Sequence, residues 1–125
     1  MITLNAILLI CPNAKVYDPL SQRSTLNTDL KGRGGVYLWY NMETSEFYIG
    51  SSANLPQRLR SYFNATTLKR SKVSRIYNAI SKYGLGTFKL VILVDFTGEP
   101  TEHVLAQEQY YIDIFNPTYN ILTKA

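Results

Sequence analysis

Two charged side chains of this sequence fall where helical spacing predicts an apolar face. Glu108 lies four residues after Val104 and four before Ile112, inside the stripe that a helix here would turn toward the core. Arg58 shares a predicted helical face with Leu55 in the same way. Burying an ionised group costs free energy unless an opposite charge or a metal ion compensates it. The two groups could therefore form a structural ion pair, or they could bind a metal ion and an anionic substrate.

Two tyrosines flank a predicted β-hairpin. Residues 36–40 and 47–49 are short runs of strand-forming residues, and residues 41–45 form a polar connection of hairpin length. Tyr37 and Tyr48 would be neighbours on adjacent strands. Each lies near a glycine, the residue that lets a phosphate or a helix approach the backbone closely. The same pattern is also compatible with an ordinary packed sheet.

Positive charge is concentrated in the middle of the chain. The sequence of 125 residues has a formal net charge of +4, and no Asp or Glu occurs between Phe47 and Val94, where eight Lys and Arg residues lie. A field of one sign fits the phosphate backbone of nucleic acid, although a basic surface kept for solubility would look the same. The predicted nucleic-acid contacts are Arg60, Lys69, Arg70, Lys72, Arg75 and Lys82.

The composition excludes several classes of protein. A single cysteine, Cys11, excludes an internal disulfide, and with one histidine, His103, the chain lacks the ligands of a usual zinc site. The apolar opening, residues 2–10, is too short for a membrane span and lacks the basic start of a secretory signal. We expect one intracellular domain that is monomeric and has no membrane partner.

The remaining patterns predict three helices and a third strand. Asn54 is placed to cap a helix with Pro56 in its first turn, and the apolar run 88–96 predicts a central strand covered on both faces. Residues 1–33 show no sustained period and predict an extended N-terminal arm, with one possible added strand at 2–10. The helices are expected at about 54–63, 71–83 and 100–115.

Five features of the chain resemble, in order, those of one nuclease family. They are the triplets Gly35-Val36-Tyr37 and Tyr48-Ile49-Gly50, then Arg58, Glu108 and Asn120. The triplets are similar to the paired signature of the GIY-YIG nucleases, with valine in place of isoleucine in the first. The arginine resembles that of the helix after the second triplet, the glutamate the acid of a later helix, and the asparagine that of the closing segment.

The resemblance implies a fold and a reaction. It implies an α/β (α+β) nuclease domain over residues 34–125, with a three-stranded antiparallel sheet flanked by three helices, preceded by the arm at residues 1–33. It also implies an endonuclease that hydrolyses DNA to 5′-phosphate and 3′-hydroxyl ends. The implied cofactor is Mg²⁺, for which Mn²⁺ can substitute.

Two branches of the family are similar to the chain. The ending Asn-Pro-Thr-Tyr-Asn, residues 116–120, resembles the intron-encoded homing endonucleases, whereas the run 58–63 resembles the repair-incision module of bacterial excision repair. Homing enzymes often have histidine at the position of Tyr62, and the repair module has lysine at that of Ser51, so the roles of these two positions stay open. The homing branch would place the gene in a mobile intron, and abundant Tyr, Asn and Lys fit an AT-rich genome such as a fungal mitochondrial one.

Hydrolysis of a phosphodiester needs an activated water, a counter-charge for the phosphoryl oxygens and help for the leaving alkoxide. Glu108 would be the single protein ligand of a hydrated Mg²⁺, and Arg58 would hold the scissile phosphate. Tyr37 or Tyr48 would accept the proton of the water, and the family offers both assignments.

Two further residues complete the predicted catalytic set. Asn120 would maintain the architecture of the site, and Tyr62 would be either a second hydroxyl at the phosphate or a core aromatic. Two other functions remain compatible with the sequence. The chain could be a module that keeps the nuclease fold and binds DNA without cutting it, or a structural protein in which Arg58 and Glu108 form a buried pair.

Overall fold

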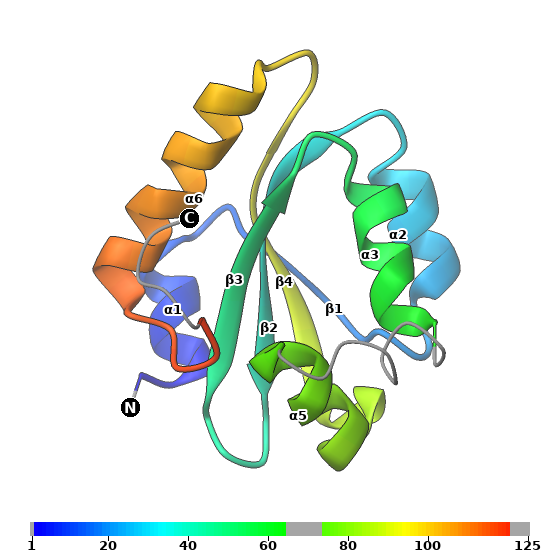
Figure 1. Ribbon diagram of the computed structural model, residues 1–125, viewed down its shortest axis with the longest axis vertical. Coiled ribbons are helices and arrows are strands. Elements are labelled where there is room, and N and C mark those ends of the chain that lie inside the picture. The colour runs from blue at the N-terminus through cyan, green and yellow to red at the C-terminus, as the bar shows by residue number, and fades with distance from the viewer. Residues whose placement is uncertain (1, 65–73, 121–125) are drawn as a thin grey trace.

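The structure is a computed structural model, and it describes residues 2–64 and 74–120. The strands and helices follow one another along the chain as drawn in Figure 1. They are α1 (Leu4–Ile10), β1 (Lys15–Tyr17), α2 (Arg23–Asp29), β2 (Gly34–Asn41), β3 (Phe47–Ser52), α3 (Leu55–Phe63), α5 (Arg75–Tyr83), a 3-10 turn (Leu85–Thr87), β4 (Phe88–Phe96) and α6 (Thr101–Phe115).

The strands form one antiparallel sheet in the order β1-β4-β2-β3. The predicted hairpin and the predicted central strand are confirmed as β2, β3 and β4. A fourth strand, β1, pairs with β4 and extends the predicted three-stranded sheet. Because β1 and β3 are the outer strands, the second triplet of the sequence signature lies on an open edge of the sheet (Figure 1).

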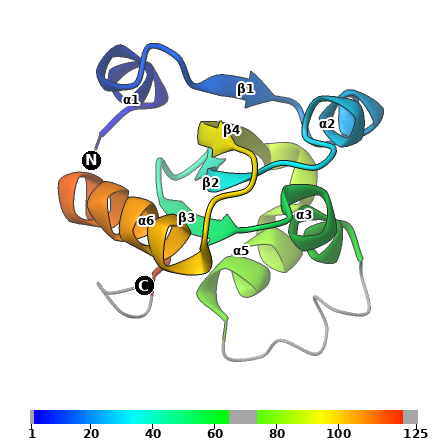
Figure 2. The same cartoon turned by 90° about the horizontal axis from the view of Figure 1, so that it is seen from above.

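Two helical layers cover the sheet, α1 and α6 on one face and α2, α3 and α5 on the other (Figure 2). Tyr37 and Trp39 point into a core shared with α2, α3 and α5. Val36 and Leu38 point into a second core shared with α1 and α6. Successive side chains of a strand face opposite sides of a sheet, so β2, whose residues are all buried, is covered on both faces.

The three predicted helices are confirmed as α3, α5 and α6. The side chain of Asn54 caps α3 by accepting the N–H of Gln57 at 3.2 Å, as its residue type predicts. Gly84 ends α5 with φ of 87°, a conformation that glycine adopts without strain. Asn116 ends α6 in the left-handed region with φ of 50°.

The prediction of an extended N-terminal arm with a strand at residues 2–10 is wrong in its secondary structure. Those residues form helix α1, because the Thr3 hydroxyl accepts the N–H of Ala6 at 3.1 Å and Ile7 is buried against the sheet. A short apolar run does not distinguish a helix from a strand by periodicity. Residues 21–33, which showed no period, contain α2, where Leu26 and Leu30 supply the buried side chains.

No helix within the described parts of the chain combines the length and the apolar character needed to cross a membrane.

Candidate active site

The site lies on the open edge of β3, between a helix from each layer (Figure 1). Tyr48 belongs to β3, Arg58 to α3 and Glu108 to α6. Burial and then the charge of Glu108 raise the pKa of the Tyr48 phenol, while the charge of Arg58 lowers it. One half-buried phenol is therefore within electrostatic reach of both a guanidinium and a carboxylate.

The hairpin brings the two signature tyrosines together, as predicted. Tyr37 pairs with Gly50 across the strands, and the ring centroids of Tyr37 and Tyr48 are 6.3 Å apart. A Cβ atom on residue 50 would lie 2.5 Å from the Tyr37 hydroxyl oxygen and 2.6 Å from Cζ. The glycine of the second triplet thus makes room for a phenol ring rather than for a phosphate or a helix.

The hydroxyls of Tyr37 and Tyr62 bond to each other and also to polar groups of the site, Tyr37 to Arg58 and Tyr62 to Tyr48. Their oxygens are 2.7 Å apart, and both side chains are fully enclosed, with 0% exposure. Burial is the largest cause that raises the pKa of each phenol above its ordinary value. Both groups are therefore neutral hydrogen-bonding side chains of the core, and Tyr48 is the signature tyrosine that reaches the surface.

Hydroxyl groups hold Arg58 in place. Its Nη1 atom donates to Ser61 Oγ at 3.3 Å and to the Tyr77 hydroxyl at 3.2 Å, and these two oxygens are 2.8 Å apart. Its Cζ atom lies 5.3 Å from the ring centroid of Tyr62. Burial alone would lower the pKa of Arg58, but the surrounding phenol oxygens outweigh it, so the guanidinium stays charged. A shallow pocket of about 240 Å³ opens beside it, lined by Ser52, Gln57, Arg58 and Ser61.

Glu108 is the acid of the site and is 9% exposed. Burial raises the pKa of its carboxyl group, while a hydrogen bond with Ser51 and the charge of Arg58 lower it. In the described residues no group of three or more His, Cys, Asp and Glu side chains could enclose a metal ion. A lone carboxylate with neighbouring hydroxyl oxygens fits Mg²⁺, which keeps several waters and takes few protein ligands.

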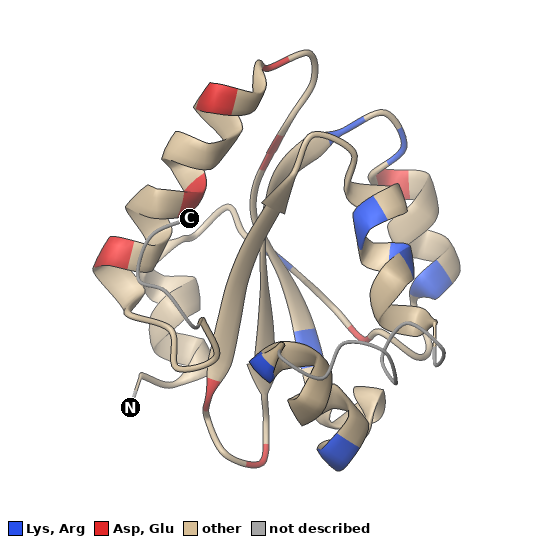
Figure 3. Ribbon diagram, in the orientation of Figure 1, with Lys and Arg blue, Asp and Glu red and all other residues tan. Residues whose placement is uncertain are grey.

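Charge is divided between the two sides of the site (Figure 3). α6 has Glu102, Glu108 and Asp113 and no Lys or Arg, whereas α3 and α5 have Lys and Arg and no acid. Of the predicted nucleic-acid contacts, Arg60 is exposed on α3, and Arg75 and Lys82 are exposed on α5. Lys69, Arg70 and Lys72 lie outside the described residues.

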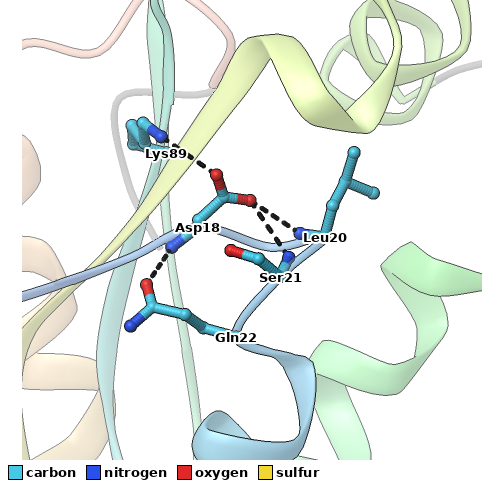
Figure 4. Close-up of polar contacts among 5 residues, drawn as sticks. All are labelled: Asp18, Leu20, Ser21, Gln22 and Lys89. Atoms are coloured by element: carbon cyan, nitrogen blue, oxygen red, sulfur yellow. Dashed lines mark hydrogen bonds and ion pairs between the residues drawn. The ribbon is translucent and has the colours of Figure 1, made fainter.

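The structural ion pair between Arg58 and Glu108, which the sequence left open, is not formed. Within residues 2–64 and 74–120 the ion pairs are Arg33–Asp95, Lys89–Asp18 and His103–Glu99. Asp18 also accepts the N–H groups of Leu20 and Ser21 and so ties the turn after β1 to β4 (Figure 4). These pairs are separate from the site, where Arg58 keeps its charge unneutralised by a carboxylate.

Asn120 holds the outer edge of β3. Its amide accepts the N–H of Ile49 at 3.1 Å and donates to the carbonyl of Ile49 at 2.9 Å. The N–H of Tyr119 donates to the carbonyl of Phe47 at 3.1 Å. The closing segment therefore binds the backbone on both sides of Tyr48, and the contact is with the strand rather than with the phenol.

Three contacts of the site were missed in the sequence. Ser61 follows Arg58 by three residues, a spacing at which helical neighbours meet, so its role was open to prediction. Tyr77 lies in the apolar stripe of α5 and looked like a core residue, and its ring is indeed buried, with 7% exposure. Ser51 was noted only as the position where the repair module has lysine, and its hydrogen bond with Glu108 joins two residues far apart in the chain, which no local pattern indicates.

Comparisons with known proteins agree with this geometry. A family model described as the GIY-YIG catalytic domain matches residues 33–120. The chain is 34% identical over 117 residues to a probable intron-encoded endonuclease bI1 of Neurospora crassa. It is 34% identical over 107 residues to UvrABC system protein C of Pseudomonas protegens. The matches cover 88% and 86% of this chain but 26% and 16% of those relatives, so the chain spans about a quarter of their length or less.

The fold also has a solved counterpart. The catalytic domain of homing endonuclease I-TevI matches with a TM-score of 0.57 at 22% sequence identity, over 71% of this chain and 98% of that one. At this identity the likeness concerns the fold. Together with the family model, which spans the hairpin, Arg58, Glu108 and Asn120, it shows that the chain belongs to the GIY-YIG nuclease family.

Proposed function

We propose that the protein hydrolyses phosphodiester bonds of DNA in a Mg²⁺-dependent reaction that leaves 5′-phosphate and 3′-hydroxyl ends. The observation that carries the proposal is the position of the half-buried Tyr48 on the edge strand β3, under the influence of both the Arg58 and the Glu108 charge. An arrangement of one phenol, one cation and one acid supplies the three groups that phosphodiester hydrolysis requires.

Arg58 would bind the non-bridging oxygens of the scissile phosphate. Its guanidinium is positioned by Ser61 and Tyr77 and remains charged. Neutral hydroxyl partners leave that charge available to the substrate, whereas a carboxylate partner would neutralise it.

Glu108 would hold the metal ion, with Ser51 orienting its carboxylate. When bound, Mg²⁺ supplies counter-charge to the phosphoryl oxygens and makes a coordinated water more acidic. The single carboxylate supports one metal ion rather than two.

Tyr48 would accept the proton of the attacking water. The raised pKa keeps this phenol protonated in the free protein, so Tyr48 would accept the proton of the water only as it releases its own proton to solvent, and the leaving 3′-oxygen would take a proton from solvent. Arg58 acts in the opposite direction and favours the phenolate. Tyr37 is the other candidate, but its hydroxyl is enclosed and bonded to Tyr62, which favours Tyr48.

Supercoiled plasmid DNA tests the reaction. Wild-type protein should convert it to the nicked form with Mg²⁺ and not with EDTA, and DNA ligase, which needs a 5′-phosphate and a 3′-hydroxyl, should reseal the nicks. Glu108→Ala should bind DNA as the wild type does and should not nick it. Glu102→Ala, which removes an exposed acid in the first turn of the same helix, is the matched control and should nick at the wild-type rate.

The second candidate function is DNA binding without cleavage. If wild-type protein binds DNA but nicks nothing with Mg²⁺ or Mn²⁺, the chain is a DNA-binding module on a nuclease fold. The relative from Neurospora crassa, a probable intron-encoded endonuclease, supports the homing branch, and the relative from Pseudomonas protegens, at the same identity, supports the repair branch. Preference for one target sequence over damaged or branched DNA would support the homing branch.

A further inference from the structure

A second pocket, of about 330 Å³, opens between α5 and the segment that follows α6. Arg75, Ala79 and Lys82 line it from α5, Tyr119 lines it from the closing segment, and Glu46 from the start of β3. α5 lies near the hairpin end of the sheet, whereas α3 and α6 flank β3 (Figure 1). The pocket shares no lining residue with the shallow pocket beside Arg58.

Both walls of this pocket belong to elements that also contact residues of the active site. On α5, the Tyr77 hydroxyl accepts from Arg58 at 3.2 Å. On the other wall, Tyr119 precedes Asn120, whose amide binds the backbone of β3. The same two elements therefore border the active site and the pocket, and a polymer bound at the one lies near the other.

Two cations stand at the ends of the pocket. Arg75 and Lys82 are seven residues apart, so they project from one face of α5, about 10 Å apart along the helix axis. Both are exposed, and neither takes part in the ion pairs of the described residues. Arg75 donates a long bond of 3.4 Å to the carbonyl of Thr118, and Lys82 Nζ lies 5.2 Å from the ring centroid of Tyr83. Within the described residues no carboxylate forms an ion pair with either cation, and Glu46 is the acid that lines the same pocket.

The other residues that line the pocket include apolar, aromatic and acidic side chains. Ala79, Tyr83 and Tyr119 supply the apolar and ring surfaces. Glu46 accepts a hydrogen bond from the Tyr119 hydroxyl at 3.4 Å. A carboxylate repels phosphate but accepts the amino groups of bases, and bases stack on aromatic rings. A nucleotide would thus place its phosphates at the rim and its base inside.

We propose that this pocket binds one nucleotide of the strand that is cut, with its flanking phosphates on Arg75 and Lys82 and its base toward Tyr119 and Glu46. The proposal rests on the proposed DNA-cleaving function and adds a substrate subsite to it. A base in a duplex is stacked and paired, so the bound nucleotide has to leave the stack. The cleaved strand is accordingly distorted next to the cut.

The charge part of the proposal is tested by binding in EDTA, where no cleavage occurs. Full-length Arg75→Gln and Lys82→Gln should each bind a labelled duplex about 5- to 10-fold more weakly and lower the slope of log K against log salt by about one. Lys15→Gln on β1, at the opposite edge of the sheet, is the matched control and should change neither quantity. An equal loss of DNA affinity in Lys15→Gln would overturn the proposal, because it would indicate that positive charge anywhere on the protein contributes equally to binding.

The position of the subsite is tested by replacing one phosphate of the cleaved strand at a time with an uncharged methylphosphonate. At one position the replacement should weaken DNA binding by the wild type, whereas binding by Arg75→Gln should not weaken further at that position. Independent losses at every position would refute a defined contact. 2-Aminopurine at the adjacent nucleotide should change fluorescence on binding, and Glu46→Gln should alter base preference at that position without altering the salt slope.

Plasmid nicking by the wild type separates this subsite from the proposed function. Nicking without any coupling between Arg75 and a phosphate would retain the nuclease and refute the subsite. Coupling without nicking would retain the subsite and refute the nuclease.

Discussion

Replacing Tyr77 with phenylalanine should slow DNA cleavage without unfolding the protein. The substitution removes the hydroxyl that accepts from Arg58 but keeps the ring, whose centroid lies 4.9 Å from that of Tyr62 in a stacked arrangement. A hydrogen bond from a charged donor contributes about 1.5–3 kcal/mol at good geometry. The bond to Tyr77 is long, at 3.2 Å, so we expect about 1 kcal/mol, a loss of about 5-fold in the cleavage rate constant.

Ser61 makes the effect of Tyr77 non-additive. Its hydroxyl is 2.8 Å from that of Tyr77, and both accept from the same Arg58 nitrogen. Ser61→Ala should also cost about 5-fold, but the double variant should lose about 10-fold rather than about 25-fold, because the first substitution already disturbs the second contact. Because Arg58 is displaced rather than removed, the loss should appear in the rate constant of single-turnover cleavage, measured with saturating protein.

Stability is the control for this experiment. The free energy of unfolding of Tyr77→Phe should fall by less than about 1 kcal/mol, since the buried ring remains. Tyr110→Phe, on an exposed part of α6, should cleave at the wild-type rate. The reasoning is refuted if Tyr77→Phe also cleaves at that rate while Arg58→Ala is inactive.

Three other substitutions test the frame of the site. Gly50→Ala should lower the free energy of unfolding by about 1–3 kcal/mol in urea, because its Cβ would overlap the enclosed ring of Tyr37; wild-type stability would contradict that packing. Asn120→Ala should cost about 1–2 kcal/mol by the same assay and should slow nicking further, because both backbone groups of Ile49 lose their partner; an unchanged nicking rate at a temperature where the variant is folded would limit Asn120 to stability. Glu108→Gln should gain stability over the wild type as pH rises from the ordinary carboxyl pKa of 4.5 toward neutrality. The pKa of Glu108 is raised in the folded state, so the fold favours the protonated carboxyl group. The wild type loses that contribution to stability as the pH passes the raised pKa, whereas the uncharged glutamine keeps it. A difference in urea-unfolding free energy that does not depend on pH would contradict the raised pKa.

The parts of the fold that could be predicted from sequence are those with a long, regular pattern. α3, α5 and α6 each carry an apolar stripe and a recognisable start or stop, and β4 is a long apolar run. The N-terminal elements are shorter, and the Thr3 cap of α1 precedes an apolar run too short to show a period. α1 and α2 are helices of seven residues, and β1 has three residues that are ordered by pairing with β4. Tertiary packing, which a local pattern does not report, determines all three.

The residues of the candidate site were likewise predictable from sequence only in part. Glu108 and Arg58 stood out because a charge in an apolar stripe is costly, and both do lie at the edge of β3. The alternative that they form a structural ion pair is not realised, because α3 and α6 pack on opposite faces of the sheet. Tyr37 and Tyr62 differ from Tyr48 in being enclosed, and alternation along a strand could not reveal this, since helices cover both faces.

The way in which Arg58 is held has a consequence for substrate binding. A half-buried guanidinium needs hydrogen-bond acceptors, and in most proteins a carboxylate supplies them and neutralises the charge. Here the acceptors are the hydroxyls of Ser61 and Tyr77, and the face of the group lies near the ring of Tyr62. These partners satisfy the hydrogen-bond donors of the guanidinium and leave its positive charge intact. The nearest acid of the site, Glu108, is kept on the opposite face by α6 and is oriented by Ser51 instead. The sheet edge therefore separates a cation that can bind phosphate from an acid that can bind a metal ion, and Tyr48 lies between them.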